Sequence, residues 1–361
     1  MSHSQSLLLG SLERTFLTHK PLQGLKCYSI AHASVQNLRL FSTSKSFAHG
    51  NPLGLPRSGE RIPPKIPTRG GPPEKRPIPH VKRVIAVASG KGGVGKSMVA
   101  ANLAMSLALN SHGSRPLKVG LLDLDIFGPS IPKLMGLERV GEPELSKSGA
   151  LIPLINHGIP CMSMGFLLPK SPSGESDPSA AVVWRGLMVQ KATQQLLFDV
   201  DWRGAAGDAG TGLDVLVVDM PPGTGDVALT FGQLVKADGA VIVSTPQDVA
   251  LIDVRKGVSM FNKVSIPILG LLLNMSHFTC PTCPPNTAEP HYIFGPTTHF
   301  HKAAREMGTS VLGELPLVPG VSRGGDAGIP IVLHPGESAQ EREVGEVMRE
   351  VGSKIYTALD L

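Results

Sequence analysis

The 361-residue sequence predicts an α/β fold with a doubly wound, mostly parallel sheet, and three observations lead to this prediction. Short aliphatic runs alternate with segments of helical spacing, which is typical of parallel strands covered by helices on both faces. A glycine-rich loop joins the first aliphatic run to the first helical segment. Two further runs end at aspartates, and open α/β sheets bind their ligands at the carboxyl ends of the strands.

The individual elements follow from these runs in chain order. Strands are predicted at residues 84–88, 117–122, 213–218, 239–244, 267–273 and 311–315. Helices are predicted at residues 97–110, 186–198, 249–263 and 298–307. Residues 169–180, rich in Pro and Ser, and residues 203–212, rich in Gly and Ala, are predicted to be surface insertions.

The first 80 residues differ in composition from the rest of the chain. Residues 1–41 are basic, rich in Ser and Leu and nearly free of acid, and Arg39-Leu40-Phe41-Ser42 resembles a matrix-protease cleavage site. This pattern predicts a mitochondrial presequence and a matrix location; a tail without targeting function is the alternative. Residues 42–80 are dense in Pro and Gly and are predicted to form an extended linker, followed by one domain at residues 81–361.

The distribution of charge argues against a nucleic-acid partner. Residues 1–80 carry eleven basic and three acidic side chains, a net charge of +8, against +5 for the whole chain, so residues 81–361 carry −3. A mildly acidic domain with 4% aromatic residues lacks both the basic surface and the stacking side chains that bind nucleic acid. No apolar run reaches the ~20 residues needed to span a bilayer, so no stable membrane insertion is expected.

The glycine-rich loop is a phosphate-binding motif. Residues 90–97 match the pattern G-x-x-x-x-G-K-[ST] between a strand and a helix and read Gly90-Lys91-Gly92-Gly93-Val94-Gly95-Lys96-Ser97. Glycines allow backbone N–H groups to face the phosphates at the positive end of the helix. Lys96 is predicted to contact the β- and γ-phosphates, and the Ser97 hydroxyl to ligate Mg²⁺.

Acidic residues at strand ends complete the predicted site. Asp219 follows the strand at residues 213–218 in the position of a Walker B carboxylate, which holds Mg²⁺ through water. Asp123 and Asp125 follow the second strand, and alternation along an extended chain predicts that both lie on one side. The loop at residues 221–226 is predicted to lie beside the γ-phosphate, as a switch segment or a rigid turn.

Lys91 adds a second lysine within the loop, and G-K-G-G-V-G-K-S resembles the deviant Walker A motif of the MinD/ParA/nitrogenase-reductase class of P-loop NTPases. The resemblance implies ATP as the nucleotide and a homodimer in which Lys91 reaches the nucleotide of the partner subunit. It also implies that Asp123 lies in the Mg²⁺ shell and that Asp125 orients the attacking water. Asn274, after the fifth strand, then contacts adenine.

Cys280 and Cys283 form a C-x-x-C pair just after the fifth predicted strand. Two thiolates at this spacing can hold one metal or two irons of a cluster, so two pairs in a homodimer would complete a bridging [4Fe–4S] site. A redox dithiol, a structural zinc site with further ligands and an uncoordinated pair are the alternatives. Cys161 lies in an apolar stretch and is predicted to be a buried thiol.

Several motifs together resemble the Mrp/Nbp family of iron–sulfur carrier ATPases, in its mitochondrial NUBPL-like branch. Besides the phosphate loop they are residues 123–130 (DLDIFGPS), 184–186 (WRG), 219–226 (DMPPGTGD), 274–276 (NMS) and Cys280-x-x-Cys283. The resemblance implies slow ATP hydrolysis coupled to transfer of a labile [4Fe–4S] cluster, with subunits of respiratory complex I among the recipient apoproteins.

Two other classes share the loop motif. The MinD/ParA positioning ATPases bind membranes or DNA, but the last 25 residues here are not a basic amphipathic segment. Nitrogenase reductase, an electron-transferring ATPase, uses separated cysteines instead of a C-x-x-C pair. The cluster carrier is therefore the leading hypothesis, with the positioning ATPase as the alternative.

Overall fold

The structure is a computed structural model that describes residues 74–110, 115–167, 186–203, 211–283, 289–334 and 336–361. Within these residues one eight-stranded sheet has the order β10-β7-β6-β1-β5-β2-β4-β3, parallel except for the edge strand β3. Its strands are β1 (Val81–Ser89), β2 (Val119–Asp123), β3 (Leu154–Asn156), β4 (Ile159–Ser163), β5 (Leu213–Asp219), β6 (Gly239–Ser244), β7 (Ile268–Asn274) and β10 (Val311–Leu315). A separate two-stranded ribbon pairs β8 (Phe278–Thr279) with β9 (Pro290–His291).

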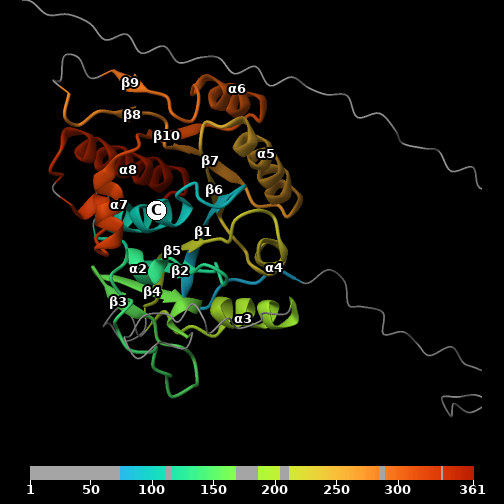
Figure 1. Cartoon of the computed structure of the whole chain (residues 1–361). Helices are drawn as coiled ribbons and strands as arrows, with labels where there is room; N and C mark the ends of the chain where they lie inside the picture. The colour runs from blue at the N-terminus through green and yellow to red at the C-terminus, as the bar shows by residue number, and fades with distance from the viewer. Residues whose placement is uncertain (1–73, 111–114, 168–185, 204–210, 284–288, 335) are drawn as a thin grey trace, which may run out of the picture. The chain divides into compact units, whose positions relative to one another are not determined.

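Helices cover both faces of the sheet (Figure 1). They are α1 (Lys96–Ala108), α2 (Ile131–Leu134), α3 (Gly186–Phe198), α4 (Asp226–Leu234), α5 (Asp248–Lys263), α6 (Thr298–Glu306), α7 (Pro319–Asp326) and α8 (Ala339–Ala358), with 3₁₀ turns at Met164–Phe166 and Ile331–Leu333. α1 and α8 pack together on one face, whereas α5 lies on the other against β1, β6 and β7. The predicted doubly wound α/β fold is therefore confirmed.

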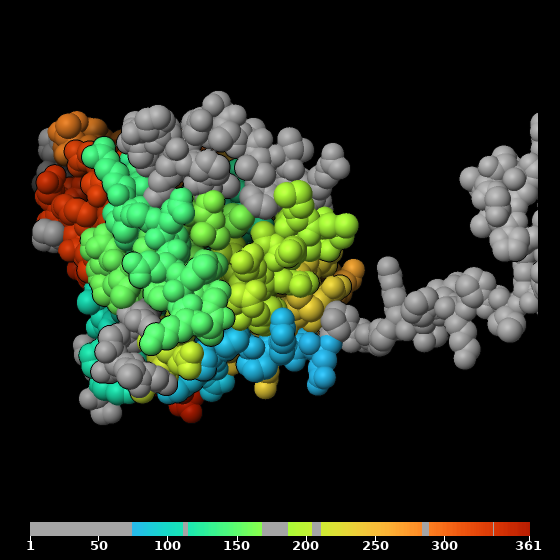
Figure 2. Space-filling model, turned by 90° about the horizontal axis from the view of Figure 1, so that it is seen from below, coloured from blue at the N-terminus to red at the C-terminus, as the bar shows by residue number. Residues whose placement is uncertain are grey.

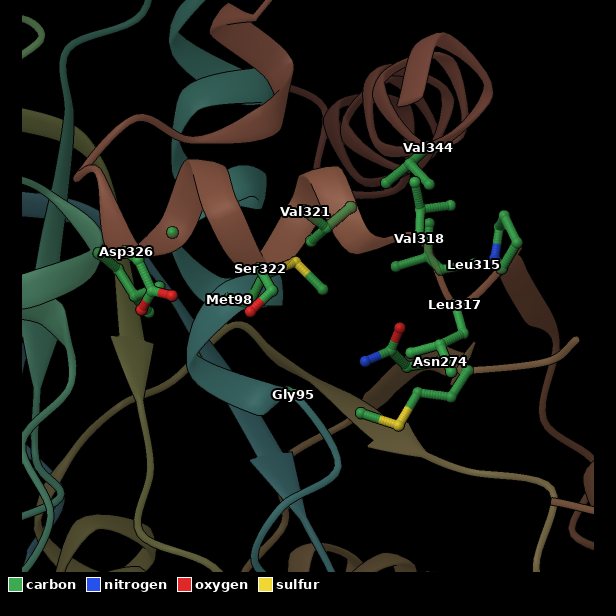
Figure 3. A pocket seen from close by; sticks show the side chains of 14 residues that line it. Gly95, Met98, Asn274, Leu315, Leu317, Val318, Val321, Ser322, Asp326 and Val344 are labelled. Carbon is green, nitrogen blue, oxygen red and sulfur yellow. The ribbon is translucent and has the colours of Figure 1, made fainter. Parts of the chain in front are cut away.

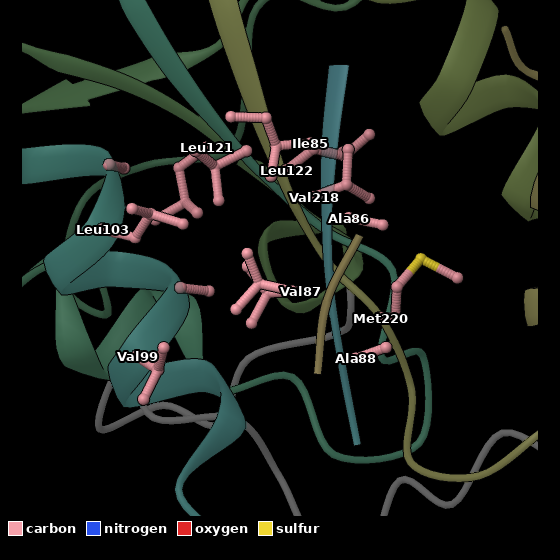
Figure 4. Packing of buried hydrophobic residues seen from close by; sticks show 14 of the residues in the cluster. Ile85, Ala86, Val87, Ala88, Val99, Leu103, Leu121, Leu122, Val218 and Met220 are labelled. Carbon is pink, nitrogen blue, oxygen red and sulfur yellow. The ribbon is translucent and has the colours of Figure 1, made fainter. Parts of the chain in front are cut away.

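The core forms where α1 meets the central strands (Figure 4). Val99 and Leu103 of α1 are fully buried against β-strand residues that include Val87 and Leu121. Strands buried on both faces must be apolar throughout, which explains the near-continuous aliphatic runs in the sequence. The six predicted strands are all present, with ends shifted by up to three residues.

The sheet extends two strands beyond the prediction, at the edge where β4 pairs with β2 and β3 pairs with β4. Each of these strands is short, and Gly158 makes the tight turn between them with a φ of 78°. Cys161 lies fully buried in β4, as predicted, and burial raises the pKa of its thiol. Figure 2 views this end of the molecule, where residues 137–156 lie beside α3, and Leu151 forms a bridge with Val200, two residues after the end of α3.

The last residues of the predicted linker are folded onto the domain. Ile78 is 1% exposed, Arg76 forms a bridge with Val235, and its guanidinium lies 3.6 Å from the centre of the Phe198 ring. Lys75 donates to the carbonyl of Val264. Residues 74–80 of the predicted linker therefore pack on the domain, chiefly through Ile78, and the boundary at residue 80 stays a prediction. Residues 1–73 lie outside the described residues, so the presequence and the rest of the linker stay predictions.

This N-terminal segment, residues 74–80, is expected to stabilise the domain. Ile78→Ala in the full chain should lower the free energy of unfolding by about 2–5 kcal/mol, because it removes a buried side chain and leaves a cavity. Ile155→Ala is the matched control: its side chain is half-exposed, so the change should stay within about 0.5 kcal/mol. Denaturant titration of both variants measures their free energies of unfolding. Equal losses of stability in the two variants would contradict a stabilising role for residues 74–80.

Candidate functional site

The phosphate loop connects β1 to α1 at the carboxyl edge of the sheet. Gly93 and Gly95 have φ values of 78° and 83°, in the left-handed region that favours glycine. A side chain at Gly95 would also collide with the Asn274 amide nitrogen. The loop lines a cavity of about 540 Å³, the phosphate cavity, so its backbone and the N-terminus of α1 face a space that suits an anion.

Lys96 and Asp219 form a buried ion pair at the base of this cavity. The Lys96 ammonium lies 2.5 Å from Asp219 Oδ1 and 3.2 Å from the Ser97 hydroxyl. Asp219 is fully buried, and burial raises its pKa, with Lys96 acting in the opposite direction. Its other oxygen, Oδ2, has no hydrogen-bond partner among the described residues, which makes it a free acceptor beside the phosphate loop.

Asp123 lies next to Asp219, since the two residues are register partners in the β2–β5 ladder. Its carboxylate is fully buried and accepts hydrogen bonds from four protein groups, the N–H groups of Asp125, Ser130 and Ile131 and the hydroxyl of Ser163. Burial and the charge of Asp219 raise the pKa of Asp123 to about 7. The carboxylate thus holds the following loop in shape, and its place in a Mg²⁺ shell stays a prediction.

That loop carries Asp125 into the phosphate cavity. Asp125 is half-buried and lines the cavity, and burial raises its pKa. Opposite, Pro222 lines the same cavity, and the N–H of Gly223 donates to the carbonyl of Ser89 at 2.8 Å. The segment at residues 221–226 therefore lies beside the phosphate loop, and its position beside a γ-phosphate stays a prediction.

A second, mainly apolar cavity of about 270 Å³ adjoins the first (Figure 3). Gly95 and Met98 line both cavities, so the second, the base cavity, is placed where a nucleotide base can follow its phosphates. Asn274 is 4% exposed and donates from Nδ2 to the carbonyl of Val94 at 2.8 Å. The amide oxygen is then oriented to accept from a ligand in the cavity.

Sequence reasoning missed several residues of these cavities. The wall of the base cavity opposite Asn274 consists of Leu315 at the end of β10, the following residues Pro316, Leu317 and Val318, and Val321 and Ser322 of α7. Lys133 of α2 lines the phosphate cavity. The run Leu-Pro-Leu-Val-Pro after the last predicted strand was the available signal, because it begins at the same edge of the sheet as the phosphate loop.

The Lys91 side chain contacts Gln247 of its own subunit. Its ammonium lies 2.5 Å from Oε1 of Gln247, the residue before α5. The side chain is half-buried and lines the phosphate cavity together with Lys96. Because the side chain is long and lies at the edge of the phosphate cavity, the ammonium could exchange Gln247 for another acceptor.

The cysteine pair lies on a hairpin that follows β7. This hairpin, here called the cysteine hairpin, consists of β8, Cys280–Cys283 and β9, with residues 284–288 outside the described residues. Cys280 is partly exposed and Cys283 exposed. Among the described residues no third His, Cys, Asp or Glu joins them in a possible metal-ligand group. In the part of the chain described, one subunit thus offers two thiols.

The two thiols should differ in reactivity. Hydrogen bonds from Thr282 and Cys283 lower the pKa of Cys280 to about 7, whereas its thiolate raises the pKa of Cys283. Because the thiolate is the nucleophile, Cys280 of the metal-free protein should react with iodoacetamide first, with a rate that rises through pH 7 and then levels off. Peptide mass spectrometry against pH measures both sites; faster labelling of Cys283 at pH 7 would contradict this order.

Comparison with known proteins gives the relationships of the chain. The family model "ParA: NUBPL iron-transfer P-loop NTPase" matches residues 80–352. The "Iron-sulfur cluster transfer protein NUBPL" of Mus musculus is 48% identical over 80% of this chain and 82% of its own length. The "Iron-sulfur protein required for NADH dehydrogenase, mitochondrial" of Arabidopsis thaliana is 48% identical over 70% of this chain and 72% of its own length.

A solved structure shares the same fold. The nucleotide-binding protein of Archaeoglobus fulgidus, determined in complex with ADP, has a TM-score of 0.54 and 36% identity, and the match covers 69% of this chain and 87% of that one. No helix among the described residues is both long and apolar enough to cross a bilayer. The fold, the phosphate loop and a match over most of the chain agree, and the protein belongs to the NUBPL iron-transfer family of P-loop NTPases.

Proposed function

We propose that the protein is an ATP-dependent iron–sulfur carrier that holds a labile [4Fe–4S] cluster between two subunits and delivers it to mitochondrial apoproteins. The observation that carries the proposal is the position of the cysteine pair. Cys280 and Cys283 follow β7 and the phosphate loop follows β1, and these parallel strands end at one edge of the sheet. A subunit pairing through this edge would bring nucleotide and cysteines of both chains together.

The phosphate cavity is suited to binding and slowly hydrolysing ATP. Lys96 would exchange Asp219 for the β- and γ-phosphates, since a phosphate oxygen offers the same charge-assisted contact. Asp125 lines this cavity, and as a positioning carboxylate it would orient the attacking water. Asn274 would accept from the amino group of adenine in the base cavity, which selects adenine over guanine.

The donor set also fits Mg²⁺. The Ser97 hydroxyl and the unpartnered Asp219 Oδ2 are oxygen donors at the base of the phosphate cavity, and Mg²⁺ prefers oxygen ligands with several waters retained. Ser97 would bind the ion directly and Asp219 through water. Asp123, which lies next to Asp219, would belong to the Mg²⁺ shell. When bound, Mg²⁺ supplies charge neutralisation on the phosphates.

The cluster is cargo and needs four thiolates. One described chain supplies Cys280 and Cys283, so a homodimer with its two hairpins facing each other would supply the complete set. Exposure of both thiols allows a cluster to be received and released, in contrast to Cys161, which is fully buried. This difference supports a transferable cluster over a permanent one.

The location and the recipient are proposed from the relatives. The name of the Arabidopsis thaliana relative describes a mitochondrial iron–sulfur protein required for NADH dehydrogenase. We therefore place the mature protein in the mitochondrial matrix, with apo subunits of complex I, the NADH dehydrogenase of the respiratory chain, among its recipients. The basic segment at residues 1–41 supports import.

Anaerobic reconstitution with iron and sulfide tests the cargo. The expected product is a dimer with a [4Fe–4S] absorption band and about four irons per two chains. A monomer that retains a full cluster would contradict the bridging site. Protein that dimerises with ATP but binds no iron would favour a positioning ATPase instead.

The dimer is tested at Lys91. Lys91→Ala should abolish ATP-dependent dimerisation in analytical ultracentrifugation, because the lysine is proposed to contact the nucleotide of the partner subunit. Gln247→Ala is the matched control, since it removes the contact of Lys91 within its own chain and leaves the lysine in place. Loss of the dimer in both variants, or in neither, would show that Lys91 does not act across the interface.

A further inference from the structure

The base cavity and the cysteine hairpin are joined by a short stretch of backbone in which Ser276 is fully buried. Asn274, which lines the base cavity, is only six residues before Cys280. Between them Met275 adopts a φ of 56°, in the left-handed region, which is strained for a non-glycine residue. Such a conformation persists only where neighbouring contacts hold it, so the path between the two sites is fixed by its surroundings.

Ser276 supplies those contacts. It is fully buried, its N–H donates to the carbonyl of Leu315 at 3.0 Å, and its hydroxyl lies 3.1 Å from the same carbonyl. The hydroxyl is also 3.0 Å from Nδ1 of His277, whose own carbonyl accepts from the N–H of Leu317 at 2.7 Å. Three hydrogen bonds thus tie the residues before the hairpin to the end of β10 and to the segment that follows it.

That segment is a shared wall between two cavities. Leu317 and Val318 line the base cavity on one side and, on the other, a cavity of about 240 Å³ whose lining includes Thr279 and Pro281. Thr279 and Pro281 are the neighbours of Cys280 in the chain. A base that displaces the wall therefore pushes against the hairpin from two directions, through Asn274 and through Leu317.

We propose that Ser276 is a positioning residue through which nucleotide in the base cavity sets the position of the cysteine hairpin. This inference rests on the proposed function, because it links the proposed nucleotide site to the proposed cluster site. Nucleotide binding shifts Leu315 and Asn274 together, and the bonds of Ser276 carry that shift to Cys280. Binding of nucleotide and access to the thiols are then coupled, and the coupling is reciprocal at equilibrium.

The test compares alkylation of Cys280 by iodoacetamide in metal-free protein with and without saturating Mg-ATP. In the wild type the two rates should differ by about fivefold or more, the lower range of ordinary coupling between sites. In Ser276→Ala the two rates should agree within about twofold, while ATP affinity measured on the same samples stays at the wild-type value. A purely structural role would change both rates equally and preserve their ratio.

Ser106→Ala is the matched control, because it removes another buried serine hydroxyl that bonds a backbone carbonyl, in α1 and away from the path. It should keep the wild-type ratio, as should Ser276→Thr, which retains the hydroxyl. If Ser276→Ala does not fold, amide hydrogen exchange of residues 289–295 in the wild type is measured instead, with and without ATP. Equal exchange rates in the two conditions overturn the proposal. A wild-type protein that binds ATP without any change in alkylation overturns the inference alone, whereas absence of ATP binding overturns the proposed function as well.

Discussion

Lys96→Met is expected to lower ATP affinity by about 2–5 kcal/mol, or roughly 30- to 5,000-fold, and to abolish hydrolysis. The lysine is 6% exposed and is the cation at the base of the phosphate cavity, so no other side chain in that position replaces its contact with the β- and γ-phosphates. Isothermal titration with Mg-ATP measures the affinity, and phosphate release measures hydrolysis. An unchanged affinity would contradict the role assigned to the loop.

Loss of binding must be separated from loss of folding, because Lys96→Met also leaves Asp219 without its cation. Removing one partner of a buried pair costs about 3–5 kcal/mol. Adding Asp219→Asn should restore most of that stability without restoring ATP binding. Lys256→Met on α5 is the control for loss of a lysine whose ion pair is exposed, and it should change neither property by more than about 1 kcal/mol.

Cys280→Ala combined with Cys283→Ala is expected to eliminate the cluster after anaerobic reconstitution. Each subunit then supplies no thiolate, so iron content should fall from about four per two chains to background, and the absorption band of the cluster should disappear. ATP affinity should stay within about threefold of wild type, since neither cysteine lines a nucleotide cavity. Iron and sulfide analysis of the purified dimer gives the result.

Cys161→Ala provides the matched control for this loss. Its thiol is fully buried in β4, and the raised pKa keeps it protonated, so it is unsuited to ligate iron. The variant should retain the full cluster. A cluster that survived the double substitution but was lost in Cys161→Ala would reverse the assignment of the ligands.

The sequence predicted the central part of the fold because that part obeys simple rules. Strands buried on both faces are apolar along their whole length, as in β5 and β6, and such runs are visible without a structure. β3 was missed because three residues at the edge of the sheet carry little periodicity, and β4 because its short run contains Pro160. Ile78 was missed because a single anchoring residue in a proline-rich segment has no pattern.

The candidate site was predictable only in part, for a physical reason. The phosphate loop is one continuous segment, so its glycines and Lys96 can be recognised from the sequence alone. The base cavity combines α7, β7 and the segment after β10, which only the folded sheet brings together. Likewise, the four donors around Asp123 come from two separate segments, the loop that follows β2 and the end of β4. Their number shows that Asp123 holds this loop in shape, which alternation along a strand does not reveal.

Cluster transfer under the control of ATP is the central claim, and one measurement tests it most directly. The reconstituted dimer is mixed anaerobically with an apo iron–sulfur subunit of complex I, with and without Mg-ATP, and the recipient is separated and assayed for its cluster. The recipient should acquire a [4Fe–4S] cluster, at a rate that changes with ATP in the wild type and becomes insensitive to ATP in Lys96→Met. A recipient that acquires no cluster, or acquires it at one rate regardless of ATP and of Lys96, would contradict ATP-controlled transfer.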